Sequence, residues 1–113
     1  MSKRIGDHAE LLALNYLKEQ GLTLISRQFH SRFGEIDLIM REQLTFVAVE
    51  VKYRKNADFG YAHECVSPKK LAKMRVTFEY FAKMHGLNTN SITIRLDVVA
   101  FTGSHVTWLK NVA

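Results

Sequence analysis

The chain has 113 residues, 47% of them hydrophobic and one of them proline, which excludes a disordered chain and predicts one domain over residues 1–113. Sixteen basic and eleven acidic residues give a formal net charge of +5, which suits a polyanionic partner without requiring one. The single cysteine, Cys65, excludes an internal disulfide, and no apolar run has the length of a membrane span, so we expect a cytoplasmic protein without a membrane partner.

The first predicted element is a helix that ends at Gly21, because apolar residues recur before this glycine at helical spacing. These residues are Ile5, Ala9, Leu12, Ala13, Tyr16 and Leu17. A short strand over residues 22–29 follows, and a polar, basic connection over residues 30–34 leads to the next strand.

Two strands over residues 35–40 and 44–52 carry the most informative pattern. In the second strand Glu50 and Lys52 share one face, and valines occupy the other face. The first strand places Asp37 on one face and three apolar residues on the other: Ile36, Leu38 and Met40. A slip of one residue would set acids against valines, so the apolar pattern fixes the pairing. We therefore expect Asp37 opposite or diagonal to Glu50, with Cβ atoms about 5 or 7 Å apart.

A second helix is predicted to begin at Pro68, with Ser67 as its N-cap, after a loop over residues 56–66. Two further strands are predicted over residues 92–101 and 105–109. The order of helix, three strands, helix and two strands predicts a mixed α/β or α+β fold in which helices pack against a central sheet.

Asp37, Glu50 and Lys52 together suggest a metal-binding site, because two neighbouring carboxylates repel each other unless a cation lies between them. Mg²⁺ accepts one or two carboxylates together with water and phosphate oxygens. An ammonium group beside it can orient water or neutralise charge on a phosphate, as in metal-assisted phosphodiester hydrolysis. The alternative interpretation is an exposed sheet face on which Glu50 and Lys52 are ordinary solvated charges.

Glu10 also has two interpretations. It is in line with the apolar residues of the first helix and can therefore face the sheet, where a carboxylate requires a partner or a metal. Asp7 and Glu10 also have the spacing of a capping box, which would place Glu10 in the first turn of the helix.

Basic residues surround these acids in the sequence and can follow a phosphate backbone, although a basic helix face is often only solvated surface. The candidates for nucleic-acid contact are Arg27, Arg32, Arg54, Lys55, Lys69 and Lys70.

The chain resembles a known family in the motifs GEIDLIM (34–40), FVAVEVKYR (46–54) and RLDVVAF (95–101), with Phe59-Gly60 and Lys69 or Lys70 between the last two. The resemblance is to the YraN-like family of bacterial proteins that are predicted to be nucleases. That family is similar to the restriction-endonuclease-like superfamily with its PD-(D/E)xK motif, and especially to archaeal Holliday-junction resolvases. The resemblance implies a restriction-endonuclease-like fold with a central, mixed five-stranded sheet flanked by helices.

By position, Asp37 and Glu50 match the two acids of that motif and Lys52 matches its lysine. Glu10 matches the first-helix glutamate that completes the metal site, which favours the metal interpretation over the capping one. Glu35 shares the face of Asp37 and is expected to support the site. Ile36 stands where the name of the motif has proline.

The resemblance implies a Mg²⁺- or Mn²⁺-dependent endonuclease that hydrolyses DNA, including branched or Holliday-junction-like DNA, and that acts as a homodimer. Two alternatives remain open at this point: a catalytically inactive nucleic-acid-binding or assembly module with the same fold, and a nuclease directed at RNA.

Overall fold

The computed structural model describes residues 3–58, 60–62 and 66–112, so Phe59 and Cys65 lie outside the described residues. The described chain forms two α-helices and five strands, in the order expected from the sequence. The elements are α1 (Lys3–Glu19), β1 (Thr23–Ser31), β2 (Gly34–Glu42), β3 (Thr45–Arg54), α2 (Pro68–Met84), β4 (Thr93–Thr102) and β5 (His105–Leu109).

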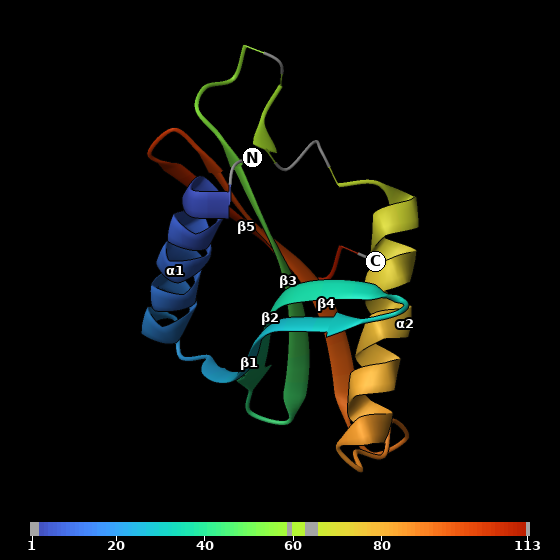
Figure 1. Cartoon of the computed structure of the whole chain (residues 1–113). Coiled ribbons are helices and arrows are strands. Elements are labelled where there is room, and N and C mark those ends of the chain that lie inside the picture. Colours follow the sequence, from blue (N-terminus) through green and yellow to red (C-terminus); the bar gives the residue numbers. More distant parts are fainter. Residues whose placement is uncertain (1–2, 59, 63–65, 113) are drawn as a thin grey trace.

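The five strands form one mixed sheet in the order β1-β2-β3-β4-β5. Strands β3 and β4 are parallel, and every other neighbouring pair is antiparallel. A parallel pair needs a crossover connection, and α2 supplies it between β3 and β4. The two helices flank the sheet on opposite sides (Figure 1). The mixed α/β fold predicted from the sequence is therefore confirmed.

Helix α1 packs against the face of the sheet that carries the β3 valines. Its buried residues are Ala9, Ala13, Leu14 and Leu17, and they meet Val47, Val49 and Val51. Full burial of one such side chain contributes about 1.5–3 kcal/mol. The chain leaves the helix at Gly21, whose φ of +99° is a conformation that glycine adopts without steric cost.

Helix α2 covers the other face. Ser67 caps it by accepting a hydrogen bond of 3.1 Å from the backbone N–H of Lys70, and Pro68 occupies the first turn, as the sequence predicted. Its buried residues include Met74, Phe78 and Phe81, which pack against apolar residues of β2, β3 and β4. No helix in the described ranges combines the length and the apolar character that a bilayer crossing requires.

The β1–β2 hairpin leaves the sheet partway along β2. Strand β2 pairs with β3 only from Leu38, opposite Val49, to its end, whereas its earlier residues pair with β1 alone. The free part of the hairpin extends across α2 (Figure 1). Gly34 fits closely there, because a Cβ at this position would lie 3.2 Å from Thr77 Oγ1.

The prediction that side chains alternate strictly along β2 was therefore wrong at one position. Leu38 and Met40 face α1 as expected, but Ile36 packs in the cluster on the α2 side. The reason is a local kink. Gln28, which lies between the paired positions Arg27–Leu38 and Phe29–Ile36, has a φ of 49°. This left-handed conformation is uncommon outside glycine, and it turns the hairpin as it leaves β3.

Candidate functional site

Asp37 and Glu50 converge where β2 separates from β3. Leu38–Val49 is the last pair of the β2–β3 ladder, so Asp37 and Glu50 stand just beyond its end, and their side chains are hydrogen-bonded to each other. Beyond this point the backbone N–H of Val51 has no β2 partner in the ladder, and Asp37 Oδ2 accepts its hydrogen bond at 2.8 Å. The Asp37 carboxyl group thus accepts the hydrogen bond that a backbone carbonyl of β2 would accept if the two strands stayed paired.

The two carboxyl groups strongly affect each other. Burial raises the pKa of Asp37 to about 8, and the hydrogen bond and repulsion from Glu50 act in the same direction. The N–H of Val51 opposes this shift of the pKa, and the more distant Glu10 adds to it. Asp37 is therefore mainly protonated at neutral pH, because its charged form is unfavourable in a buried place beside a second carboxyl group.

Two ammonium groups approach Glu50, whose exposed fraction is only 4%. Lys70 Nζ lies 3.1 Å from Glu50 Oε2, and Lys52 Nζ lies 3.7 Å from the same atom. Oε2 is buried and has no hydrogen-bond partner in the described part of the chain, so charge rather than an aligned hydrogen bond holds it. Burial lowers the pKa of Lys70, but attraction to Glu50, Asp37 and Glu35 outweighs this and leaves it raised.

Glu10 faces the sheet and is buried, as the metal interpretation required. Helix α1 begins at Lys3, so Glu10 lies in its second turn and the capping-box interpretation is wrong. Its oxygens are bound by neighbours: Arg27 Nε lies 3.3 Å from Oε1, and Gln28 Nε2 donates to Oε2 at 3.2 Å. Glu10 is thus near enough to affect the pKa of Asp37 while its own oxygens are occupied.

Glu35 lies at the entrance of the site. Its side chain is exposed and forms a 3.0 Å ion pair with His30 Nδ1. An open cavity of about 150 Å³ is lined by Glu35, Asp37, His30 and Gln28, among others. This cavity provides solvent access to Asp37.

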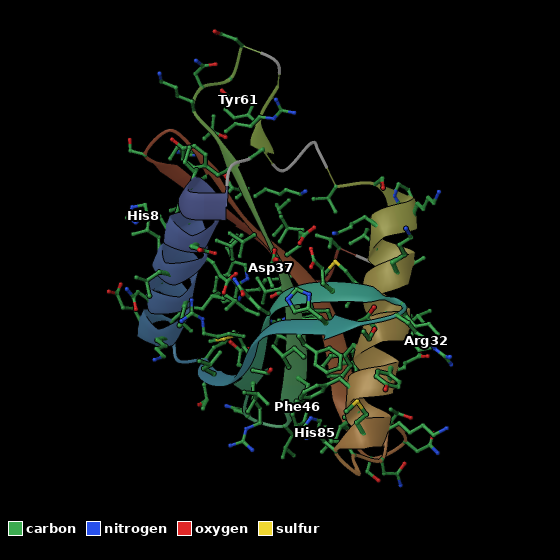
Figure 2. The ribbon with its side chains drawn as sticks, in the orientation of Figure 1. His8, Arg32, Asp37, Phe46, Tyr61 and His85 are labelled. Atoms are coloured by element: carbon green, nitrogen blue, oxygen red, sulfur yellow. The ribbon has the colours of Figure 1, made fainter. Side chains whose placement is uncertain are left out.

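The predicted basic residues do not form one patch. Arg27 is paired with Glu10, and Lys70 is paired with Glu50. Arg32 lies at the hairpin tip, where its guanidinium stacks 4.9 Å above the ring of Phe33. Figure 2 shows it beside α2, away from Asp37 in the body of the fold. The remaining three are Arg54 at the end of β3 and the exposed Lys55 and Lys69.

Sequence reasoning missed the roles of Gln28 and Lys70. Gln28 binds Glu10 and, at 3.3 Å, Asp7, but a lone glutamine in a strand carries no signal. Lys70 was expected to contact nucleic acid, whereas the structure places it on the acid. Its position three residues after the N-cap, at the start of a helix that faces the sheet, was the available hint.

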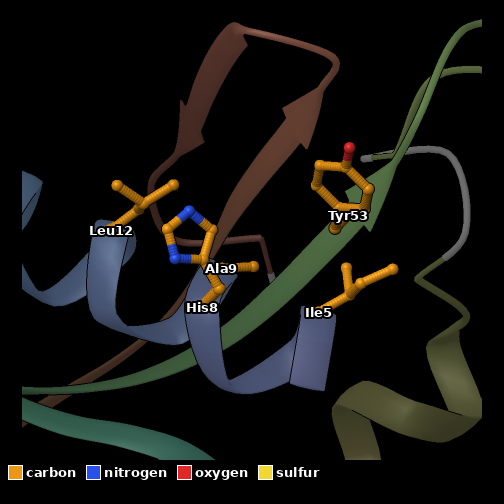
Figure 3. Close-up of a pocket in the computed structure, with 5 residues that line it drawn as sticks. All are labelled: Ile5, His8, Ala9, Leu12 and Tyr53. Carbon is orange, nitrogen blue, oxygen red and sulfur yellow. The ribbon is translucent and has the colours of Figure 1, made fainter. Parts of the chain in front are cut away.

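A separate apolar hollow of about 510 Å³ lies between α1 and the end of β3. Ile5, His8, Ala9, Leu12 and Tyr53 line it (Figure 3). None of the candidate site residues lines this hollow. It therefore takes no part in the carboxylate site.

A sequence model of the "Uncharacterised protein family UPF0102" matches residues 9–101. The chain belongs to the UPF0102 family. A UPF0102 protein of Vibrio cholerae is 42% identical over 112 residues, which cover 97% of this chain and 92% of the relative. Another from Colwellia psychrerythraea is 46% identical over 110 residues, which cover 94% of this chain and 85% of the relative. The UPF0102 match spans the four residues Glu10, Asp37, Glu50 and Lys52.

The carboxylate pair of this UPF0102 chain fits a divalent cation that binds oxygen. Glu50 Oε2 is a buried acceptor that has ammonium groups nearby but no aligned hydrogen bond from any described donor, and burial together with the adjacent Glu50 raises the pKa of Asp37. No three acidic, histidine or cysteine side chains in the described ranges lie together as a metal-binding group. Two carboxylates are nevertheless a sufficient protein contribution for Mg²⁺, which keeps water and takes phosphate oxygens at its other positions.

Proposed function

We propose that this chain is a divalent-metal-dependent endonuclease that hydrolyses phosphodiester bonds of DNA. The observation that carries the proposal is the convergence of the Asp37 and Glu50 carboxyl groups beside two ammonium groups, at 3.1 and 3.7 Å from one buried Glu50 oxygen. The resemblance of the surrounding motifs to the PD-(D/E)xK nucleases supports the same chemistry, since that fold is used for it but does not by itself ensure it.

Asp37 and Glu50 are the residues that would hold Mg²⁺ or Mn²⁺, with Glu10 as a third carboxylate when Arg27 and Gln28 release it. The bound metal supplies Lewis-acid stabilisation of phosphoryl charge and makes water more acidic. Glu35, at the mouth of the cavity beside Asp37, supports the site from the solvent side.

The ammonium group of Lys52 orients the attacking water and neutralises negative charge that develops on the phosphate. It belongs to the same strand as Glu50, so the rigid backbone of β3 fixes the spacing of acid and amine. Lys70 approaches from α2 and offers a second positive charge to the substrate once Glu50 has another partner.

The substrate is held mainly through its phosphate backbone. Arg32, Lys55 and Lys69 are exposed and can make this contact, and Arg54 at the end of β3 is the fourth basic residue proposed for it. Affinity should therefore fall steeply with salt concentration. Resolvase-like cutting of branched DNA would further require a homodimer, which sedimentation of the purified protein in the presence and absence of DNA would test.

A nuclease assay tests the proposal with supercoiled, linear, branched and single-stranded DNA and with RNA, each with Mg²⁺, Mn²⁺ or a chelator. Asp37→Asn and Lys52→Ala should each reduce cleavage by at least about 100-fold, since groups one step further from a metal are already worth 10- to 100-fold. Glu19→Gln, at the exposed end of α1, is the matched control and should cleave normally. Cleavage that survives both site substitutions would come from a contaminant and would remove the proposal's support.

The second candidate is a nucleic-acid-binding module that does not cut. The occupied oxygens of Glu10, and the lack of a three-residue metal group among the described residues, favour it. Binding to DNA or RNA without cleavage under every metal condition, with no change in Asp37→Asn, would establish this alternative. Cleavage of RNA alone would instead redirect the proposal to an RNA nuclease.

A further inference from the structure

The tip of the β1–β2 hairpin and the outer side of α2 enclose an open hollow of about 470 Å³. The turn contributes Arg32 and Phe33, and α2 contributes Val76, Glu79, Tyr80 and Lys83. The hairpin reaches this position because it separates from β3 at Asp37, so the carboxylate site and the hollow lie along one continuous segment of chain.

Two aromatic rings in the hollow remain open to solvent, with exposed fractions of 36% for Phe33 and 37% for Tyr80. Their centroids are 5.4 Å apart in an edge-on arrangement. Tyr80 also contacts Phe29, whose ring packs 5.1 Å from that of the buried Phe81. The contact with Phe29 thus ties Tyr80 to the core, and Phe33 packs against Tyr80, so the pair presents an aromatic surface to solvent.

More basic than acidic side chains border this surface. Arg32 stacks over Phe33, and Lys83 and the acidic Glu79 both line the hollow from α2. Lys73 lies beside the hairpin, where its Cβ is 3.9 Å from the position of a Cβ on Gly34. It is seven residues before Tyr80, so both lie on nearly the same line along α2. Three basic side chains against one acidic side chain leave a positive balance, which suits a planar ligand attached to a polyanion.

The same helix links the hollow to the carboxylates. Lys70 contacts Glu50, Lys73 follows on the same side one turn later, and Tyr80 is two further turns along. At 1.5 Å per residue, Lys70 and Tyr80 are about 15 Å apart along the axis. A stacked strand rises 3.4 Å per nucleotide, so this separation spans about four nucleotides.

We propose that this hollow binds an unpaired base of a nucleic-acid strand whose backbone passes Lys73 and Lys70 to reach the carboxylate site. The inference rests on the proposed function and narrows its substrate to strands with unpaired nucleotides, such as single-stranded tails, flaps and branch points. In an intact duplex the bases are stacked inside and present only their edges, whereas an unpaired base can stack on an aromatic side chain.

Fluorescence anisotropy of labelled oligonucleotides in metal-free buffer tests this inference without cleavage. Wild-type protein should bind a single strand or a flap more tightly than a blunt duplex of equal length. Phe33→Ala and Tyr80→Ala should each weaken single-strand binding by about 5- to 100-fold, the range for one lost stacking contact. Leu44→Ala, an exposed apolar residue in the β2–β3 turn with an exposed fraction of 82%, is the control and should bind normally.

A 2-aminopurine placed about four nucleotides from the expected scissile bond gives a second readout, because stacking quenches its fluorescence. Quenching should occur with wild-type protein and be lost with Phe33→Ala. Phe33→Tyr and Tyr80→Phe keep the rings and should retain both signals, which covers the case in which an alanine variant fails to fold.

Equal affinity for duplex and single strand, or unchanged binding in both alanine variants, would overturn the inference. A change of sedimentation rather than of affinity in those variants would overturn it as well, since the hollow would then be a contact between copies of the chain. Loss of cleavage in every metal condition, together with ring-dependent binding of single strands, would remove the proposed nuclease while leaving the base site in place.

Discussion

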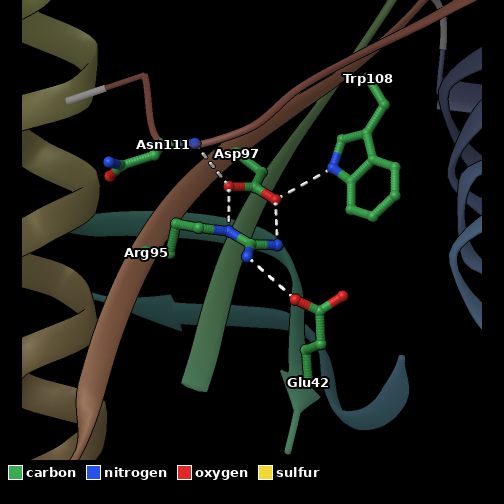
Figure 4. Close-up of polar contacts among 5 residues, drawn as sticks. All are labelled: Glu42, Arg95, Asp97, Trp108 and Asn111. Atoms are coloured by element: carbon green, nitrogen blue, oxygen red, sulfur yellow. Dashed lines mark hydrogen bonds and ion pairs between the residues drawn. The ribbon is translucent and has the colours of Figure 1, made fainter. Parts of the chain in front are cut away.

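Two buried carboxylates on neighbouring strands differ in how their oxygens are satisfied. Asp97 on β4, with an exposed fraction of 0%, accepts four hydrogen bonds of 2.9 Å. Two come from Arg95, one from the Trp108 indole and one from the Asn111 backbone, and Arg95 also contacts Glu42 at 3.1 Å (Figure 4). Glu50 on β3 is almost as deeply buried but leaves Oε2 without a hydrogen bond from any described residue.

The Asp97 arrangement is typical of a structural carboxylate, whereas the Glu50 arrangement is the one that the proposed function uses. Burial of a charge is costly unless partners compensate for it, and Asp97 has such partners on both oxygens. The hydrogen bonds that Arg95 donates to Asp97 also raise the pKa of Arg95, although its partial burial lowers it. At the Glu50 site two ammonium groups, rather than aligned hydrogen-bond donors, compensate the buried oxygen, beside a carboxyl whose pKa is raised to about 8. Under the proposed function, an added cation would bind these two carboxyl groups.

The largest expected effect on stability comes from substitution of Asp97. Asp97→Ala removes the acceptor of four hydrogen bonds and leaves the Arg95 guanidinium with Glu42 as its remaining described carboxylate partner. We expect a loss of about 3–5 kcal/mol in the free energy of unfolding. Asp37→Asn keeps an acceptor for the Val51 N–H and removes a charge conflict, so its stability should equal or slightly exceed that of wild type. Urea unfolding of both variants measures these changes. Equal destabilisation would contradict the inferred difference between the Asp97 and Glu50 sites.

The next effect is the pH dependence of stability. In the folded protein the pKa of Asp37 is about 8 against an ordinary value of 3.8, so the folded state binds the proton more tightly than the unfolded state. Stability from this group is therefore present at low pH and is lost as pH rises from about 4 to 8.

Allowing for solvent that still reaches the group, we expect a loss on the order of 2 kcal/mol between pH 5 and pH 8. The measurement is the difference between wild type and Asp37→Asn across this range. Mg²⁺ should reduce the slope, because a cation favours the ionised form. A stability that rises over this interval because of Asp37 would contradict the assignment.

A smaller effect separates two adjacent lysines. Lys70 contacts Glu50, whereas Lys69 is exposed. In metal-free buffer Lys70→Ala should lower stability by about 1 kcal/mol, between the values for exposed and buried ion pairs, and Lys69→Ala should change it by less than about 0.5 kcal/mol. Added Mg²⁺ should raise the melting temperature of Lys70→Ala more than that of Lys69→Ala. Identical responses would show that Lys70 does not serve Glu50 as a counter-ion.

The smallest effect concerns the exposed pair of Glu35 and His30. Glu35→Gln should change the free energy of unfolding by less than about 1 kcal/mol, and 1 M salt should remove the difference, because exposed ion pairs are weak and screened. Thermal melts at low and high salt measure it. A larger, salt-resistant loss would place Glu35 within the buried part of the site.

The sequence predicted the facing of Asp37 and Glu50 because that depends on local alternation and on the valines that fix the register of β3. It also predicted the start of α2, which Ser67 and Pro68 determine locally. It did not predict the partners of Glu10 or the place of Lys70. Those depend on the angle at which the hairpin leaves the sheet and on the packing of α2, and residues far apart in the chain set both.

The left-handed conformation of Gln28 has a consequence for how the hairpin is held. Gln28 lies between the paired positions Arg27 and Phe29, where the part of β2 that pairs with β3 gives way to the part that pairs with β1 alone. Beyond this bend the hairpin is held by the β1–β2 pairing and by packing on α2. Under the proposed function, a ligand at Arg32 and Phe33 would be connected to Asp37 through this short, bent segment of backbone.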